Sequence, residues 1–252
     1  MTNRFVDKII EVYNRLKYTS WYYSLLLKYG IGNKDSNCAI VMFHHILDNY
    51  SNEILDSCQC TLDEFCEFCE FVSKEYNVVS IRDFVQQVNN EKNRLLVVSF
   101  DDVPNTFYTN AYPILKKYKI PFVLYISNSF LDTEGYLTSA QIKQLSIDPL
   151  CTIGAHTRNH QFLKYCLDLQ DEIVTSKEEL EKIINKEIRD FAYPYGTPTA
   201  INNSVIKFVE KSKSFDTAVT TIPVLVNSNI IKNQFALPRI QSKLFMSKYK
   251  NK

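Results

Sequence analysis

Two adjacent carboxylates near the middle of the chain are the first residues whose types suggest chemistry. In "VVSFDDVPNT", residues 97–106, Asp101 and Asp102 directly follow β-branched and aromatic residues that are typical of a buried strand. Two carboxylates this close resist being ionised together, and a bound cation would offset their repulsion. The alternative is that both only cap a following helix, whose first turn contains Pro104.

Two histidines form the second candidate group. "HTRNH" places His156 and His160 four residues apart, which suits two metal ligands on one helix face, or on a strand end and the turn after it. With Asp102 the set becomes His, His and Asp, which leaves coordination positions open for water and substrate. Asp101 would then be free to accept a proton from a metal-activated water. A solvated turn without metal is the alternative.

Short apolar runs alternate with amphipathic helical segments along the chain. Such alternation indicates a mostly parallel α/β sheet, and this number of units indicates a barrel. The predicted strands are residues 38–43, 95–100, 121–127, 151–157, 190–194, 216–222 and 235–240. The predicted helices are residues 61–76, 80–88, 105–118, 139–145, 169–186 and 200–212.

Local signals indicate where two of these helices begin and where a third is interrupted. Thr61 and Glu64 form a predicted capping box, Ser80 is a predicted N-cap, and Pro113 is expected to kink the helix over 105–118. In barrels of parallel strands, functional residues gather at the carboxyl ends of the strands. The four histidines, His44, His45, His156 and His160, all fall at or just after predicted strand ends.

Three motifs together resemble a known family. "SFDD", "HTRNH" and "FAYPYG" look like the first three motifs of the polysaccharide deacetylases, carbohydrate esterase family four. Members are deformed (β/α) barrels that remove acetyl from N-acetylated sugars with a divalent metal, usually zinc. The resemblance implies Asp101 as general base. It also implies a metal site that holds zinc, or cobalt, nickel or iron, on Asp102, His156 and His160.

The third motif adds further expected site residues. In "YPYG" the resemblance implies that the backbone N–H of Tyr195 stabilises the oxyanion of a tetrahedral intermediate, a usual task of preorganised backbone donors. Tyr193 and Pro194 of the same motif are expected to contact substrate.

The start of the matching region refines the resemblance. "IVMFHHI", residues 40–46, is similar to the N-terminal strand of the poly-N-acetylglucosamine deacetylase branch, whose barrel is circularly permuted. We therefore expect a permuted, seven-stranded barrel with His44 as general acid for the leaving amine. His45 is the competing acid and is otherwise expected to contact substrate. A histidine pair that merely bridges polar groups in a loop is the alternative.

The chain also departs from the family pattern. Family members carry an arginine in the third motif that orients the catalytic aspartate, and Ala192 occupies the matching position here. We hypothesise that Arg239, in "LPRI", supplies this cation from a later strand end. The Asp–Trp element of the fourth motif is not evident, and the only tryptophan, Trp21, lies far upstream.

Composition narrows the partners and the compartment. The 252 residues include 29 Lys and Arg and 28 Asp and Glu, so a net charge of +1 gives no reason to expect a nucleic-acid partner. Seven cysteines without a regular framework favour a reducing, cytoplasmic setting. A zinc knot at Cys66 and Cys69, with Cys58 and Cys60, is an alternative, but their helical spacing favours packing.

The N-terminal segment is expected to differ from the rest. Residues 1–37 are predicted as a helical segment before one catalytic domain at 38–252, with no export signal and no stretch long enough to span a membrane. Residues 13–29 carry leucines, aromatics and flanking lysines that suit peripheral contact with the inner membrane face, or packing against the domain. The sequence does not indicate whether the protein is a monomer or an oligomer.

The expected partner is an N-acetylated saccharide or a nucleotide- or lipid-linked sugar precursor of a surface polysaccharide. Three alternatives remain open. They are a metal hydrolase of another amide, ester or phosphate substrate, a non-catalytic carbohydrate-binding relic of the fold, and an interaction protein of a membrane-bound assembly complex.

Overall fold

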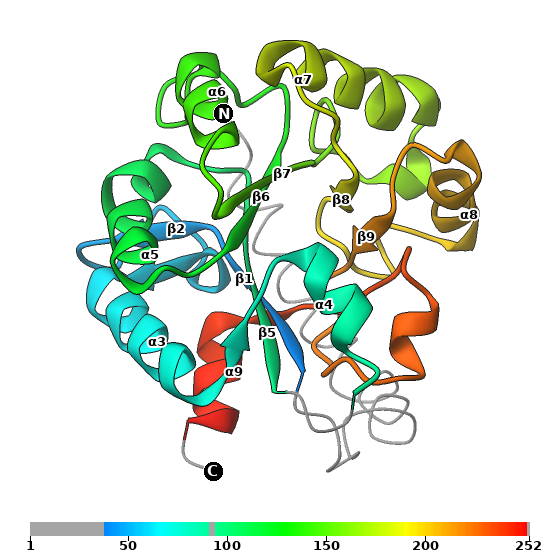
Figure 1. The fold of residues 1–252 in the computed structure, drawn as a ribbon. Helices are drawn as coiled ribbons and strands as arrows, with labels where there is room; N and C mark the ends of the chain where they lie inside the picture. The colour runs from blue at the N-terminus through cyan, green and yellow to red at the C-terminus, as the bar shows by residue number, and fades with distance from the viewer. Residues whose placement is uncertain (1–37, 91–93, 251–252) are drawn as a thin grey trace. The chain divides into compact units, whose positions relative to one another are not determined.

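The computed structural model describes residues 38–90 and 94–250. Seven parallel strands follow one another in the order β10-β1-β5-β6-β7-β8-β9, and the sheet curls into a barrel with helices around its outside (Figure 1). The strands are β1 (Ala39–Phe43), β5 (Leu95–Asp101), β6 (Phe122–Ile126), β7 (Cys151–Ala155), β8 (Asp190–Ala192), β9 (Thr217–Val219) and β10 (Ile240–Gln241). The predicted deformed (β/α) barrel with seven strands in its main path is confirmed.

Shorter strands complete the pairing. β4 (Asn77–Val78) pairs with the first residues of β5, which makes the sheet eight-stranded. β2 (His45–Leu47) and β3 (Gln59–Thr61) form a separate two-stranded parallel sheet that the sequence patterns did not reveal. Because β2 follows β1 after a single residue, His44, the chain turns from one sheet to the other at the predicted histidine pair.

Alternation along the strands separates an inner from an outer face. All residues of β1, β5 and β6 are buried, as expected for strands that are covered on both sides. Leu96, Val98 and Phe100 join the large cluster that packs against the helices, whereas Leu95 and Val97 join a smaller cluster with residues of β6, β8 and β9. The side chain of Asp101 continues the second series, so it points into the barrel.

The last strand is shorter than the predicted run of residues 235–240. Leu237 makes an isolated parallel bridge to Val219 of β9, and regular pairing with β1 begins only at Ile240. Pro238 has no N–H for a ladder, which accounts for the gap between the bridge and β10. This short segment nevertheless connects the two edges of the path, β9 and β1.

Seven α-helices pack against the described sheet. They are α3 (Leu62–Glu75), α4 (Ile81–Gln87), α5 (Tyr112–Tyr118), α6 (Ser139–Ser146), α7 (Ser176–Ile184), α8 (Asn203–Ser212) and α9 (Ser242–Tyr249). The buried hydrophobic residues of α4 join the smaller, inner cluster, whereas those of the other six helices join the large outer cluster. Short 3-10 segments lie at Asp56–Cys58, Leu163–Tyr165 and Ile230–Lys232. The capping box of Thr61 with Glu64 and the cap at Ser80 are confirmed.

Two predicted helices are interrupted. The segment over 105–118 begins with a π-helical turn (Phe107–Ala111) before α5, and Pro113 lies at the start of α5. The segment over 169–186 begins with a second π-helical turn (Gln170–Thr175) before α7. A π turn adds one residue and so changes which side chains face the sheet after it.

Two further expectations concern the N-terminal segment and the cysteines of α3. Residues 1–37 and their predicted membrane contact lie outside the described residues, and no helix within 38–90 and 94–250 is long and apolar enough to cross a membrane. Cys69 is fully buried on α3 and Cys66 is half-buried there. Within the described part of the chain, neither belongs to a group that could hold a metal ion.

Candidate metal centre and active site

Asp101 ends β5 inside the barrel and is held by Arg239. The carboxylate is 2% exposed, and its two oxygens accept bonds of 2.5 and 2.6 Å from the two terminal nitrogens of the guanidinium. Burial raises the pKa of this carboxyl, but the charge of Arg239 outweighs it and keeps the pKa well below its usual range. Asp101 is therefore ionised and fixed in orientation.

Arg239 is itself fully buried and is held by residues of β5 and β6 and by the residue that follows β9. Its Nε donates to the carbonyl of Thr220 at 3.0 Å, one terminal nitrogen also donates to Ser99 Oγ at 3.3 Å, and the guanidinium lies over the Tyr125 ring at 5.3 Å. Ala192 has no charged side chain to contribute. The contact that we hypothesised between Arg239 and Asp101 is thus present in the structure.

The turn after β5 separates the two neighbouring acids. Asp102 has φ of 59° and Val103 has φ of 48°, and the N–H of Val103 donates to the carbonyl of Asp101 at 2.6 Å. A left-handed conformation is costly for a β-branched residue and is found mainly where the surroundings enforce it. The turn at Asp102 and Val103 lets the Asp101 side chain bond to Arg239 while the Asp102 side chain faces the two histidines of the second motif.

Asp102, His156 and His160 form a group that could hold a metal ion. Their ligand atoms lie within 4.8 Å of one another, and the described residues contain no other such group of histidine, cysteine and acidic side chains. Asp102 Oδ1 lies 3.6 Å from His156 Nε2 and 3.3 Å from His160 Nε2. This oxygen is buried without a hydrogen-bond donor, so the site fits a cation.

The ring of His156 is oriented for coordination by its other nitrogen. Nδ1 lies 2.7 Å from the carbonyl oxygen of Ala192, to which it donates when Nε2 carries the lone pair that faces Asp102. Burial lowers the pKa of His156 to about 4, with the charge of Asp101 opposing the shift. The imidazole is therefore neutral near pH 7, which is the form that binds metals.

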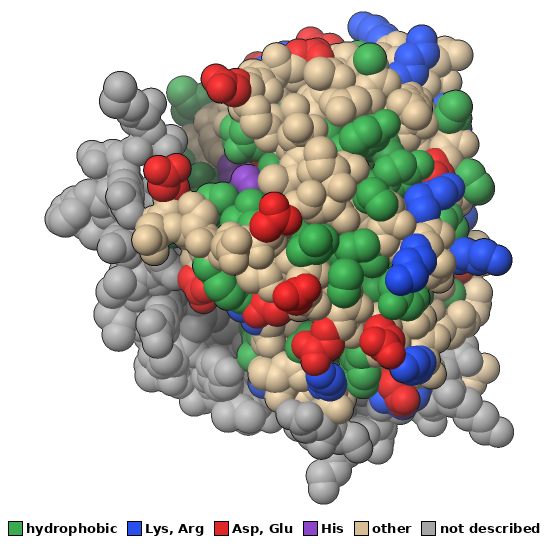
Figure 2. All heavy atoms as spheres, turned by 90° about the vertical axis from the view of Figure 1, so that its left-hand side faces the viewer, with side chains coloured by type: hydrophobic (Ala, Val, Ile, Leu, Met, Phe, Trp, Pro, Cys, Tyr) green, Lys and Arg blue, Asp and Glu red, His purple; other side chains and the backbone are tan. Residues whose placement is uncertain are grey.

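The spacing of the two histidines is realised by a strand end and a turn, one of the two arrangements expected. His156 directly follows β7, and His160 lies in the next turn with φ of 50°. The ring of His160 contacts the rings of Phe130, at 5.6 Å, and Tyr195, at 4.8 Å. Figure 2 shows histidine atoms in a hollow of one face, bordered by hydrophobic side chains.

His44 and His45 both lie at the site. The charge of His44 acts on Asp101, and the charge of Asp102 acts on His45. Burial, followed by the neighbouring His44, lowers the pKa of His45 to about 4. Both side chains are half-buried, so the choice of His44 as the acid stays a prediction.

The third motif gives a mixed outcome. The Tyr193 side chain is fully buried, and its hydroxyl donates to the carbonyl of Phe235 at 2.9 Å. Pro194 is buried as well. Neither side chain is exposed in this structure, and substrate contact by these two residues stays a prediction. Alternation along β8 accounts for the burial of Tyr193: Ala192 faces the inner cluster, which sends Tyr193 to the helix-facing side.

Tyr195 lies in a strained turn at the rim. Its φ is 60°, its side chain is 40% exposed, and its ring stacks on Phe162 at 4.3 Å. Thr221 Oγ1 donates to the Tyr195 carbonyl at 2.6 Å. At the next residue, Gly196, a Cβ would come within 2.5 Å of the Thr221 nitrogen, so the turn requires glycine there. The oxyanion role of the Tyr195 N–H stays a prediction.

Sequence reasoning missed the residues that hold the second motif. Arg158 and Asn159, inside "HTRNH", bond to acids of the segment 169–186, which was expected to be an ordinary charged helix. The stacked rings of Phe130 and Tyr136 beside His160 were missed too, because aromatic residues at such spacings occur more often in cores.

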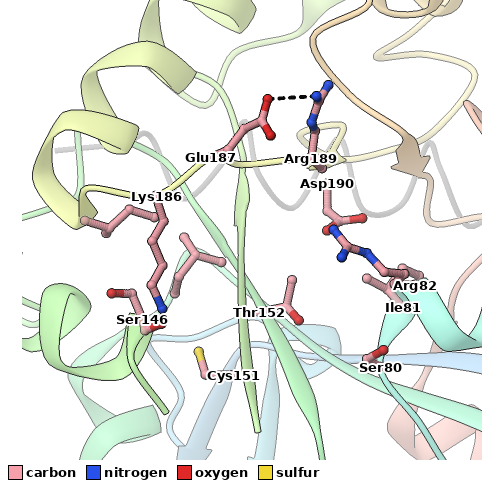
Figure 3. A pocket seen from close by; sticks show the side chains of 12 residues that line it. Ser80, Ile81, Arg82, Ser146, Cys151, Thr152, Lys186, Glu187, Arg189 and Asp190 are labelled. Carbon is pink, nitrogen blue, oxygen red and sulfur yellow. Dashed lines mark hydrogen bonds and ion pairs between the residues drawn. The ribbon is translucent and has the colours of Figure 1, made fainter. Parts of the chain in front are cut away.

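A second cavity, of about 390 Å³, opens at the amino-terminal ends of β7 and β8, away from the metal ligands (Figure 3). Its charged groups face partners within the protein. Arg189 pairs with Glu187 at 2.8 Å, and Lys186 donates to the Ser146 carbonyl at 2.6 Å. The charge of Arg82 acts on the buried Asp190. The lining of this cavity includes none of the three candidate metal ligands, so the cavity is not part of the candidate site.

Comparisons with known proteins agree with the motifs. The sequence profile of the polysaccharide deacetylase family matches residues 88–213, half of the chain. The poly-beta-1,6-N-acetyl-D-glucosamine N-deacetylase of Staphylococcus epidermidis is 27% identical over 151 residues, 53% of this chain and 51% of that protein. The protein of the same name from Staphylococcus aureus strain MRSA252 is 25% identical over 186 residues, 67% of this chain and 62% of that protein. The chain thus spans about half to three fifths of these relatives.

Solved structures share the fold. A deacetylase of Streptococcus pyogenes, PplD in complex with acetate, superposes with a TM-score of 0.71 at 24% identity, over 81% of this chain and 91% of that one. IcaB from Ammonifex degensii gives a TM-score of 0.64 at 23% identity, with the same coverage of both chains. At these identities the likeness shows the fold.

Proposed function

The chain belongs to the polysaccharide deacetylase family, and from that premise we propose that it hydrolyses the acetamido group of an N-acetylated sugar in surface polysaccharide biosynthesis. The observation that carries the proposal is the buried Asp101 carboxylate, held ionised by Arg239 beside the ligand atoms of Asp102 and the two histidines. A base, a cation site and candidate acids thus meet at one rim. Relatives named poly-beta-1,6-N-acetyl-D-glucosamine N-deacetylases support an N-acetylglucosamine substrate.

The metal ligands are Asp102, His156 and His160, and we propose zinc, with cobalt, nickel or iron as ions that accept the same donors. A bound zinc ion would polarise the amide carbonyl and bring the pKa of a bound water to about 7. Three protein ligands leave room for both water and substrate.

Asp101 is the proposed general base. Its carboxylate accepts the proton of the attacking water, and the bidentate contact with Arg239 fixes the direction in which the acceptor oxygens point. Arg239 lies behind the carboxylate and acts on the reaction only through it. We therefore assign Arg239 as a positioning residue for the base.

His44 is the proposed general acid. It delivers a proton to the sugar nitrogen as the C–N bond breaks, so that acetate and a free amine leave. The backbone N–H of Tyr195 is the proposed donor to the oxyanion that precedes this step. The exposed Tyr195 ring, stacked on Phe162, offers an apolar face to a sugar at the rim.

The form of the substrate and the place of action are also proposals. We propose a nucleotide- or lipid-linked sugar precursor handled in the cytoplasm or at the inner membrane face, because the cysteine usage of the chain suits a reducing compartment.

Acetate release separates the candidate substrates. Zinc-loaded wild type and Asp101→Asn are incubated with N-acetylglucosamine oligomers, nucleotide sugars and lipid-linked sugars. We expect acetate from at least one class with wild type and none with Asp101→Asn, which retains its zinc. Acetate from oligomers alone would contradict the precursor proposal, and zinc without acetate from any class would contradict deacetylation.

A further inference from the structure

The turn that carries His160 needs support from outside itself. Thr157 and His160 both have positive φ, 68° and 50°, which costs free energy for residues other than glycine. One hydrogen bond joins the described residues of the turn to each other, from the His160 N–H to Thr157 Oγ1 at 3.1 Å. The remaining bonds of the turn go to neighbouring elements.

Glu172, in the π-helical turn before α7, makes three of these bonds. Its carboxylate accepts from the Asn159 N–H at 3.0 Å and from Asn159 Nδ2 at 2.5 Å, one donor on each oxygen. Its backbone carbonyl accepts from the Arg158 N–H at 3.0 Å. Glu172 is 3% exposed, so water competes little for these bonds. One buried side chain thus fixes the peptide just before His160.

Arg158 ties the same turn to the same helical segment. Its guanidinium donates to both oxygens of Asp171 at 2.9 and 3.1 Å and to both oxygens of Glu179 at 2.8 and 2.9 Å. The side chains of this network are partly exposed, so each pair contributes little to the free energy of unfolding. Two bidentate pairs nevertheless define the geometry of the arginine closely.

The other side of the turn is bonded to the loop that follows β6. The N–H groups of Asn128 and Ser129 donate to the carbonyls of Thr157 and Arg158, at 3.1 and 2.8 Å. Asn128 Nδ2 also donates to Glu179, at 3.2 Å. The turn therefore lies between the loop after β6 and the segment 169–186, and the bond from Asn128 to Glu179 connects these two supports.

The two histidine ligands differ in how their rings are held. His156 has a hydrogen bond from Nδ1 to the carbonyl of Ala192, whereas Nδ1 of His160 has no hydrogen-bond partner among the described residues. The direction of the His160 ring therefore depends on its backbone turn and on the neighbouring rings of Phe130 and Tyr195. A shift of the Asn159 peptide would move the ring directly.

We propose that Glu172 is a positioning residue for the metal centre, which holds the turn over 157–160 so that His160 Nε2 faces Asp102 before the metal arrives. The inference rests on the proposed metal site, but it concerns affinity and not the chemical step. Arg158 supports Glu172 by keeping the helical segment against the turn. Three acids of the segment 169–186, namely Asp171, Glu172 and Glu179, thus support the turn that carries His160.

The test is the zinc dissociation constant of purified protein, measured by competition with a chromogenic chelator. Glu172→Gln cannot accept both Asn159 donors as the carboxylate does, and we expect its zinc affinity to fall about 10- to 100-fold. Glu178→Gln, at an exposed position of α7, is the matched control and is expected to bind zinc like wild type. At saturating zinc, kcat of Glu172→Gln is expected to return to within about twofold of wild type, because the base and acid are untouched.

A second variant guards against a folding defect. Asn159→Ala removes one of the two donors and is expected to weaken zinc binding less than Glu172→Gln, with the melting temperature of the metal-free protein near that of wild type. If wild type binds zinc and both variants bind it equally well, the positioning role is wrong while the metal site stands. If wild type binds no zinc, the proposed function itself fails.

Discussion

Removing Arg239 should separate catalysis from metal binding. Its guanidinium makes four hydrogen bonds, two of them to Asp101 at 2.5 and 2.6 Å, in a fully buried position. Bonds between charged groups contribute about 1.5–3 kcal/mol each, so the two to Asp101 represent about 3–6 kcal/mol. This agrees with the loss of about 3–5 kcal/mol that follows when one partner of a buried ion pair is removed.

The expected consequence for turnover follows from the geometry. In Arg239→Met the Asp101 carboxylate keeps no cation to orient it, and we expect kcat to fall at least about 100-fold, the effect of misplacing a reacting group by about 1 Å. Arg239→Lys keeps a charge but not the bidentate contact, and should recover only part of the rate. Zinc content should be unchanged, because Arg239 bonds to none of the three ligands.

The assay is acetate release with zinc content measured on the same samples, at least 10 °C below the melting temperature of each variant. Tyr193→Phe serves as a control for simple destabilisation, because it breaks a buried hydrogen bond that lies outside the barrel interior. Normal turnover in Arg239→Met with full zinc occupancy would refute the reasoning.

Three further predictions concern other residues. Tyr193→Phe should lower the free energy of unfolding by about 1–2 kcal/mol, because the hydroxyl donates to a buried backbone carbonyl. Turnover should stay within about twofold of wild type, and a large loss of turnover would show that Tyr193 takes part in the reaction. His44→Gln should lower kcat by about 10²–10⁴ and His45→Gln by less, and the reverse order would assign the acid to His45. Burial raises the pKa of Asp190 from 3.8 to about 6, with Thr217 opposing. The folded state therefore binds more protons than the unfolded state between about pH 4 and 6, and stability should fall as pH rises through this window by about 3 kcal/mol. Asp190→Asn should remove that dependence and be the more stable protein at pH 7, as measured by urea unfolding across pH; an unchanged pH profile would contradict the assignment.

The sequence predicted the parts of the site that depend on strand ends. The apolar run over 95–100 places Asp101 at the end of an interior strand, and alternation from Leu95 to Asp101 determines the face on which its carboxylate lies. This chain has Ala192 where the family motif carries an arginine, and that gap led to the hypothesis about Arg239, although Arg239 lies 138 residues from Asp101. Such a distant contact can be hypothesised from chemistry, but only the closed sheet brings the two residues together.

Other features were beyond the sequence patterns for physical reasons. Positive φ at Asp102 and Val103 results from tertiary constraint, and neither residue type signals it. The π-helical turn at Gln170–Thr175 reads as ordinary helical periodicity, so the role of Glu172 was hidden in a charged segment. The burial of Tyr193 was within reach, because side-chain alternation along residues 190–194 sends it away from the interior when Ala192 faces inward.

The most direct test of the central claim is to measure bound zinc and acetate release together on wild type and Asp102→Ala. Asp102 provides the buried, unpartnered oxygen on which both histidines converge. We expect about one zinc per wild-type chain with acetate release, and the loss of both in the variant. A variant that keeps zinc and full turnover, or a wild type that releases acetate without any metal, would contradict the account.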